Sequence, residues 1–193
     1  MTQKNNSFAK IISTMGHPLV TVPFVVIFLL FQTQPLKNAL FISCLVIGII
    51  QIPVLINLTK KLKKEKIESF DVSDRNERKK FYFLVLPLLI LVNLILMFTN
   101  QSKDLIYSFL FATILLLIMQ AMNYFIKSSL HVAVNVYLGF LLFNLNPIAG
   151  ILWWIFVLMI AWSRLVLKKH TTQEVVCGFI IGAICGSVLQ LFI

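Results

Sequence analysis

The chain has 193 residues, of which 59% are hydrophobic and only 12% are charged. This balance excludes an ordinary soluble domain and indicates an integral membrane protein. A net charge of +10 would favour nucleic acid as the partner of a soluble protein. Here the charge is explained by the positive-inside rule and by attraction to anionic lipid headgroups, so no nucleic-acid partner is predicted. The apolar stretches are continuous rather than alternating, which favours transmembrane helices over barrel strands.

Seven apolar segments are predicted to cross the membrane, because about 20 apolar residues in a helix span the hydrocarbon core. In chain order they cover residues 17–31, 36–58, 81–98, 104–126, 130–145, 147–167 and 174–193. The first and fifth are short for a full span. The predicted fold is therefore an all-α polytopic transmembrane bundle of six to seven helices, formed by residues 1–193 as a single integral-membrane domain.

The basic residues are distributed unevenly over the ends of these segments. If the N-terminus is inside, all but two of the 17 lysines and arginines lie on the inner side, and the exceptions are Lys37 and Lys103. The positive-inside rule then places the N-terminus and the polar loop of residues 59–80 in the cytoplasm, which for a bacterial protein means the inner membrane. The same topology brings three polar clusters, at residues 59–80, 127–131 and 164–174, to one membrane–water interface.

The cysteines and glycines of the apolar segments are interpreted as structural. Cys44, Cys177 and Cys185 form no C-x-x-C pair, so neither a disulfide framework nor a zinc site is predicted. The last segment carries small residues at four-residue spacing, a pattern that lets another helix approach closely. These residues are Gly178, Gly182 and Gly186. We interpret this glycine stripe as a packing face, with contact between two copies of the chain as a further use.

The third polar cluster combines an arginine, a histidine and a carboxylate in the pattern S-R-x5-H-x3-E, from Ser163 to Glu174. Arg164 suits an anion, because a guanidinium matches phosphate oxygens geometrically. Glu174 has two roles open to it. It completes a capping box with Thr171 at the start of the last helix. It also follows His170 by four residues, close enough to orient the imidazole and fix its tautomer.

The other two clusters are less specific. Lys127 and His131 are four residues apart and share one side of a helical turn. Their plainer interpretation is a snorkelling lysine and an interfacial histidine, with Ser129 as a helix cap. In the loop of residues 59–80, Arg75 and Arg78 are three apart and would share a helical face. Together, the three clusters offer the groups needed to hold a tetrahedral phosphate and to attack it with a histidine.

In these clusters the sequence resembles the type 2 phosphatidic acid phosphatase (PAP2) superfamily, which shares its active-site motifs with vanadium haloperoxidases. The third motif of that family is S-R-x5-H-x3-D. It is matched by Ser163, Arg164, His170 and Glu174, with glutamate in place of aspartate.

The first two family motifs are matched in part. The second, P-S-G-H, is matched at Ser129 and His131, with Leu130 in place of glycine and serine in place of proline. The first, K-x6-R-P, is matched only at Arg78, because Asp71 occupies the lysine position and a lysine replaces the proline.

The resemblance implies a metal-independent phosphomonoesterase or pyrophosphatase that needs no cofactor. His170 would attack phosphorus and form a phosphohistidine, Glu174 would orient it, and His131 would protonate the leaving oxygen. The phosphate oxygens would be held by a set of cations and a hydroxyl, with Arg75 or Lys127 as the substitute for the missing first-motif lysine. This set comprises Arg164, Arg78, Arg75, Lys127 and Ser129.

The favoured function is therefore hydrolysis of a lipid phosphate or pyrophosphate whose tail stays in the bilayer. Phosphatidate, phosphatidylglycerol phosphate and polyprenyl pyrophosphate are the candidate substrates. The alternative is a catalytically inactive family member that binds anionic lipid or serves as a structural membrane protein. A prenyl- or phosphatidyl-transferase would need several acids around magnesium, and Asp71 with Asp74 fall short of that set. A transporter would place ionisable residues at mid-membrane depth, which the predicted spans lack.

Overall fold

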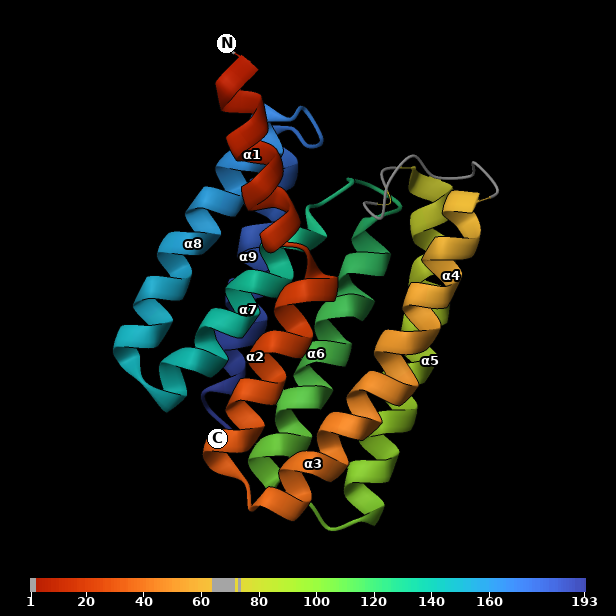
Figure 1. Cartoon of the computed structure of the whole chain (residues 1–193), viewed down its shortest axis with the longest axis vertical. Helices are drawn as coiled ribbons and strands as arrows, with labels where there is room; N and C mark the ends of the chain where they lie inside the picture. Colours follow the sequence, from red (N-terminus) through yellow and green to blue (C-terminus); the bar gives the residue numbers. More distant parts are fainter. Residues whose placement is uncertain (1–2, 64–71, 73) are drawn as a thin grey trace.

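A computed structural model of the chain describes residues 3–63, 72 and 74–193; Asp71 and most of the polar loop lie outside the described residues. The described residues form helices and no strand (Figure 1). The helices are α1 (Gln3–Met15), α2 (Pro18–Thr33), α3 (Leu36–Leu45), the π-helix η1 (Val46–Gln51), α4 (Ile52–Lys63), α5 (Arg75–Phe98), α6 (Lys103–Met122), α7 (Leu130–Leu145), α8 (Pro147–Val166) and α9 (Thr172–Leu189).

Five helical rods are long and apolar enough to cross a membrane: the continuous α3–η1–α4 rod, α5, α6, α8 and α9. α1 and α2 are together long and apolar enough for one further span, although they meet at a 45° bend, and α7 is a shorter apolar helix. The all-α fold class of a membrane helical bundle is thus confirmed, and the described residues contain five spans by length and composition, or six if α1 and α2 count as one. α1 itself was not predicted, because its first residues are polar. Its apolar face, which includes the buried Ala9 and Ile12, is too short to be recognised in the sequence as a membrane segment.

Two predicted boundaries next to the polar loops were wrong. α5 begins at Arg75 rather than at residue 81, because Asp74 caps it: the Asp74 carboxylate accepts hydrogen bonds from the backbone N–H groups of Asn76 and Glu77, both at 2.9 Å. The next helix, α6, ends at Met122 rather than at residue 126, which leaves residues 123–129 as a connection. Both corrections matter for the site, since the first places the two loop arginines on a helix and the second leaves Lys127 in a connection.

α7 is the central helix of the bundle. It packs against α2, α6, α8 and α9, and most of its residues are buried. A helix that is apolar all round belongs in the interior of a protein. Its length of 16 residues, too short for an independent span, therefore agrees with its enclosed position.

The glycine stripe of α9 faces α7 of the same chain. A methyl group added at Gly178 or Gly182 would collide with the backbone of Ser129 or Ala133, and one added at Gly186 would collide with the Phe140 ring. The small residues therefore allow α9 to approach the start of α7, where His131 lies. This face packs against α7 within the chain, and a contact between two copies of the chain through it stays a prediction.

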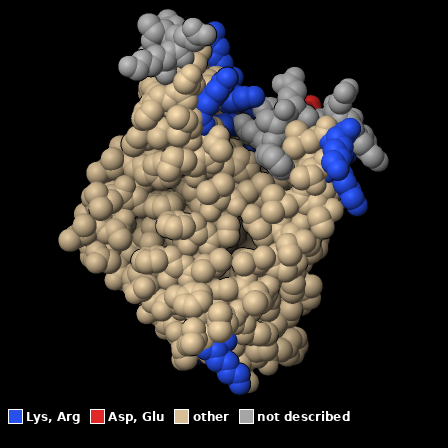
Figure 2. Space-filling model, in the orientation of Figure 1, with Lys and Arg blue, Asp and Glu red and all other residues tan. Residues whose placement is uncertain are grey.

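The described parts of the three polar clusters lie at one end of the bundle, as predicted. Figure 1 shows the end of α4, the start of α5 and the α6–α7 and α8–α9 connections at this end, and the α2–α3, α5–α6 and α7–α8 turns at the other. Figure 2 shows a band without charged residues between two ends that carry lysine and arginine. The helix order alone brings the candidate site residues to the same level.

Candidate active site

His170 lies in the tight connection between α8 and α9, where Lys168 has a positive φ of 53°. Its Nδ1 atom is 2.8 Å from Oε2 of Glu174 and 3.1 Å from the carbonyl oxygen of Lys127. A carboxylate and a carbonyl can only accept, so Nδ1 carries the proton and donates to both. The other ring nitrogen, Nε2, therefore keeps its lone pair, as a nucleophile requires.

Glu174 makes the contacts that both of the roles considered for it require. Its Oε2 atom accepts the hydrogen bond from His170 and a second one, at 3.1 Å, from the backbone N–H of Thr171. The Thr171 hydroxyl accepts the backbone N–H of Glu174 at 3.3 Å, which completes the capping box. One carboxylate oxygen thus caps α9 and fixes the imidazole.

The pKa of His170 falls from its ordinary value of 6.5 to about 4. Burial is the largest cause, because it disfavours the charged ring, and the nearby positive charge of Arg164 is the second. The hydrogen bond to Glu174 raises the pKa, and Arg78 lowers it again. The ring is therefore neutral at physiological pH, the form that can attack phosphorus.

The lowered pKa predicts how stability depends on pH. The unfolded chain binds a proton at His170 near pH 6.5, whereas the folded chain does so only near pH 4. The stabilising contribution of the neutral ring is therefore complete above pH 6.5 and is lost as the pH falls from 6.5 through 4. Thermal unfolding in detergent at pH 7 and pH 4.5 should show a smaller drop of the midpoint for His170→Asn than for the wild type. Equal drops in both proteins would contradict this assignment.

Arg78 lies in the first turn of α5 and is only 5% exposed. Its Nη2 atom donates to the carbonyl oxygen of Ser128 at 2.7 Å and to the hydroxyl of Tyr82 at 3.3 Å. Nη1 is buried and has no hydrogen-bond partner among the described residues. A buried donor without a partner is costly, and an anionic oxygen would satisfy it.

Arg78, His131 and His170 line one small pocket of about 60 Å³, which we call the phosphate pocket. His131 is 5% exposed and stands in the first turn of α7. The pocket thus combines an arginine, a neutral histidine with an available nitrogen and a second histidine. This set can bind an anion, attack it and transfer a proton.

A third histidine, His17, also lines the phosphate pocket, although no motif in the sequence predicted a role for it. It caps α2, with Nδ1 accepting the backbone N–H of Leu19 at 3.1 Å. Its ring stands edge-on to that of His131, with the centroids 4.7 Å apart. The local signal for His17 is its place before Pro18, since proline favours the first position of a helix.

Arg164 is 1% exposed and lies at the end of α8. Its Nη1 atom donates to the hydroxyl of Ser13 in α1 at 2.8 Å. Its charge lowers the pKa of His170, so it acts on the same ring as Arg78. The neighbouring Ser163 hydroxyl donates to the carbonyl oxygen of Ile160 within α8, at 2.7 Å.

Arg164 does not line the phosphate pocket, and neither do the remaining candidates. Arg75 is exposed, and its guanidinium donates to the carbonyl oxygen of Phe125 at 3.4 Å. Lys127 contributes its carbonyl oxygen to His170 rather than its ammonium group to the pocket. Ser129 is buried, and its backbone N–H donates to the carbonyl oxygen of Glu174 at 2.9 Å. Asp71, at the position of the first-motif lysine, lies outside the described residues.

Across the part of the chain that the structure describes, no group of three or more His, Cys, Asp or Glu side chains could hold a metal ion. The comparison with protein families gives one match: the model of the PAP2 superfamily covers residues 101–193, from the end before α6 to the C-terminus. The match includes His131, Arg164, His170 and Glu174 but stops short of Arg78. No curated protein and no solved structure matches the chain.

Proposed function

Because the chain belongs to the PAP2 superfamily, which in general comprises phosphatases, we propose that it hydrolyses the phosphate monoester or pyrophosphate of a membrane lipid through a phosphohistidine. One observation carries this proposal. Nδ1 of His170 donates to Glu174 and to a carbonyl oxygen, so Nε2 is the basic nitrogen of a ring that lines the same pocket as Arg78 and His131.

In the first step, Nε2 of His170 attacks phosphorus in line, and the bond between phosphorus and the leaving oxygen breaks. His131 donates a proton to that oxygen, so that the lipid leaves as an alcohol or a monophosphate. As the His170 ring becomes cationic, the charge of Glu174 stabilises it at 2.8 Å. Arg78 and Arg164 offset the negative charge of the phosphoryl oxygens, which is the main protein contribution in phosphoryl transfer.

In the second step, water attacks the phosphohistidine, and the bond between phosphorus and Nε2 breaks. His131, deprotonated in the first step, accepts a proton from that water. Inorganic phosphate leaves, and His170 returns to its neutral form. The cycle uses side chains of this chain alone.

The location of the pocket supports a lipid substrate. The residues that form it lie at one end of a bundle whose middle carries no charged residue over the surface seen in Figure 2. A phosphate held there stands at the level of lipid headgroups. By the positive-inside rule, we propose that this end faces the cytoplasm. A reporter that is active only in the cytoplasm, fused to the N-terminus, should be active. An inactive cytoplasmic reporter together with an active reporter of the outer side at the same position would reverse this orientation.

The proposed function is tested by phosphate release from purified protein in detergent, with EDTA present. Phosphatidate, phosphatidylglycerol phosphate and a polyprenyl pyrophosphate form the substrate panel, and glycerol 3-phosphate is the water-soluble control. We expect release from at least one lipid at a rate that EDTA leaves unchanged, and little from the control. Absence of release from the whole panel, or complete loss with EDTA, would contradict the proposal.

A further inference from the structure

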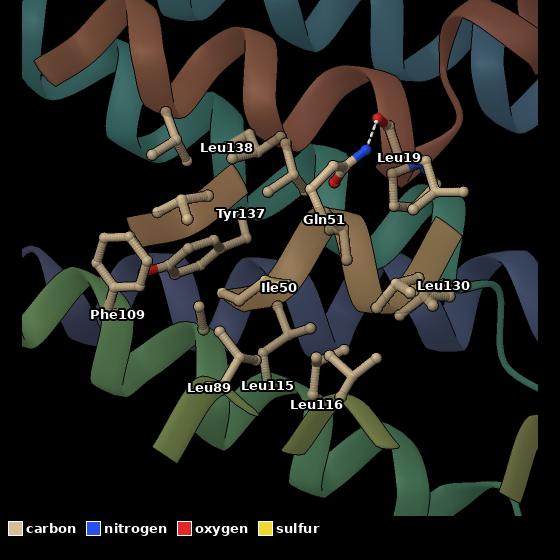
Figure 3. A pocket seen from close by; sticks show the side chains of 18 of the residues that line it. Leu19, Ile50, Gln51, Leu89, Phe109, Leu115, Leu116, Leu130, Tyr137 and Leu138 are labelled. Atoms are coloured by element: carbon tan, nitrogen blue, oxygen red, sulfur yellow. Dashed lines mark hydrogen bonds between the residues drawn. The ribbon is translucent and has the colours of Figure 1, made fainter. Parts of the chain in front are cut away.

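A second and larger pocket lies inside the bundle, and we call it the apolar pocket. Its volume is about 140 Å³, and it is lined by α2, η1, α4, α5, α6 and α7 (Figure 3). An apolar cavity of about 150 Å³ engineered in another protein stays dry and binds benzene. The apolar pocket therefore has room for a hydrocarbon segment of comparable size.

The wall of the apolar pocket presents carbon rather than polar atoms. Its three side chains with strong hydrogen-bonding groups each donate to a backbone carbonyl oxygen. Gln51 donates to Leu19 at 2.7 Å, as Figure 3 shows; Ser108 donates to Asp104 at 2.7 Å; and Tyr137 donates to Ser108. Because these groups are satisfied within the wall, water gains little from entering, whereas a hydrocarbon chain gains by burying its surface.

The apolar pocket adjoins the phosphate pocket. Pro18, Leu19, Phe81 and Leu130 line both of them. Leu130 directly precedes His131, at the position where the family motif has glycine. This departure from the motif therefore places an apolar side chain on the boundary between the two pockets. A molecule with a phosphate on a hydrocarbon chain would place its two parts on opposite sides of that boundary.

The apolar pocket lies beneath the outer surface of the bundle on one side. Figure 2 shows a small hollow in the uncharged surface, in the region where Figure 1 shows α2 beside the α3–η1–α4 rod. Both of these elements line the apolar pocket. The rod contains η1, where Gln51 ties the π-helix to the carbonyl oxygen of Leu19 in α2. Single-turn π-helical segments are frequent at functional sites.

We propose that the apolar pocket binds the hydrocarbon chain of the lipid phosphate whose phosphate is bound at Arg78, His131 and His170. The first segment of the chain is then enclosed by α2, α5, α6 and α7, rather than remaining among bilayer lipids. This inference rests on the proposed function for the identity of the phosphate group. It adds that recognition extends beyond the phosphate to the chain, so substrates with a short chain are poor.

Ala112 of α6 lines the apolar pocket and allows a test, since Ala112→Leu fills the space with a larger side chain. Ala121→Leu is the matched control, because it makes the same change on the same helix at an exposed position. The substrates are dodecyl phosphate and butyl phosphate in detergent. We expect kcat/KM for dodecyl phosphate to fall about tenfold or more in Ala112→Leu, because a buried chain segment is displaced. The rates on butyl phosphate, and both rates of the control, should stay unchanged.

The binding of dodecylphosphonate, which cannot be hydrolysed, separates this inference from the proposed function. Its Kd should rise about tenfold in Ala112→Leu and stay unchanged in Ala121→Leu, whether or not the protein turns over any lipid phosphate. An unchanged Kd, or an equal loss for butyl and dodecyl compounds, overturns the inference. Ala112→Val, a smaller filling change, gives an intermediate effect if Ala112→Leu lowers the yield of folded protein.

Discussion

Replacing His170 by alanine is expected to lower phosphate release by at least about a thousandfold, because the nucleophile of a covalent mechanism has no substitute in the pocket. The other pocket histidines cannot take over by a simple shift. His17 is engaged as the N-cap of α2. His131 lies in the first turn of α7, and its backbone carbonyl oxygen accepts a hydrogen bond from the side-chain amide of Asn135 at 2.7 Å. The measurement is the initial rate of phosphate release in detergent with EDTA.

The control for this variant lies in the same turn. Lys168 is exposed and has a positive φ, which glycine adopts without strain, so Lys168→Gly should fold normally and keep its rate within about twofold. Both variants are compared at equal amounts of folded protein, and cooperative unfolding on heating is the criterion that the protein is folded. A rate for His170→Ala close to that of the wild type would rule out His170 as the nucleophile.

Glu174→Gln is expected to lower the rate about a hundredfold to ten-thousandfold while leaving the stability nearly unchanged. Glutamine still serves in a capping box, so α9 keeps its N-terminal hydrogen bonds. The negative charge that stabilises the cationic His170 is lost, and a related loss of the orienting carboxylate costs about ten-thousandfold in serine proteases. The readouts are the rate of phosphate release and the thermal midpoint.

Thr171→Ala is expected to have the opposite effect, a lower stability with little change in the rate. It removes the hydroxyl that accepts the backbone N–H of Glu174 at 3.3 Å and leaves the carboxylate beside His170. The loss of an N-cap costs about 1 kcal/mol, so the midpoint should fall while the rate stays within a few-fold of the wild type. If Glu174→Gln instead lowered the midpoint and kept the rate, the carboxylate would serve only as a cap.

The sequence alone was sufficient to predict the fold class and the location of the polar clusters at the same end of the bundle. Continuous apolar stretches determine the helices, and the number of spans determines which helix ends share a side of the bundle. The pattern from Ser163 to Glu174 likewise predicted the contact between His170 and Glu174, because residues four apart around a tight turn can meet. These are local or topological consequences of the chain, and they need no knowledge of packing.

Packing decided the remaining features. Arg75 and Arg78 are equivalent by spacing, yet only Arg78 turns into the bundle, where Ser128 and Tyr82 hold it. Lys127 contributes a backbone carbonyl oxygen, which residue type alone does not reveal. The contact of Ser13 with Arg164 joins residues 151 apart in the chain, and Ser13 belongs to α1, whose polar first turns gave no signal of a membrane helix.

The apolar pocket was not predicted either, since it is formed by six elements distant in sequence. The sequence did show that Leu130 replaces a glycine of the family motif. Its effect became interpretable only when the structure placed Leu130 at the boundary between the two pockets. Departures from a motif are therefore informative once the space around them is known.

The central claim is that the phosphoryl group passes through Nε2 of His170, and trapping this intermediate tests it most directly. The protein is mixed with a radiolabelled lipid phosphate, the reaction is stopped with alkali after milliseconds, and the labelled position is mapped. The account predicts a label on His170 that is stable in alkali, labile in acid and absent from His170→Ala. A protein that turns over the substrate with no bound label, or with the label on another residue, would contradict it.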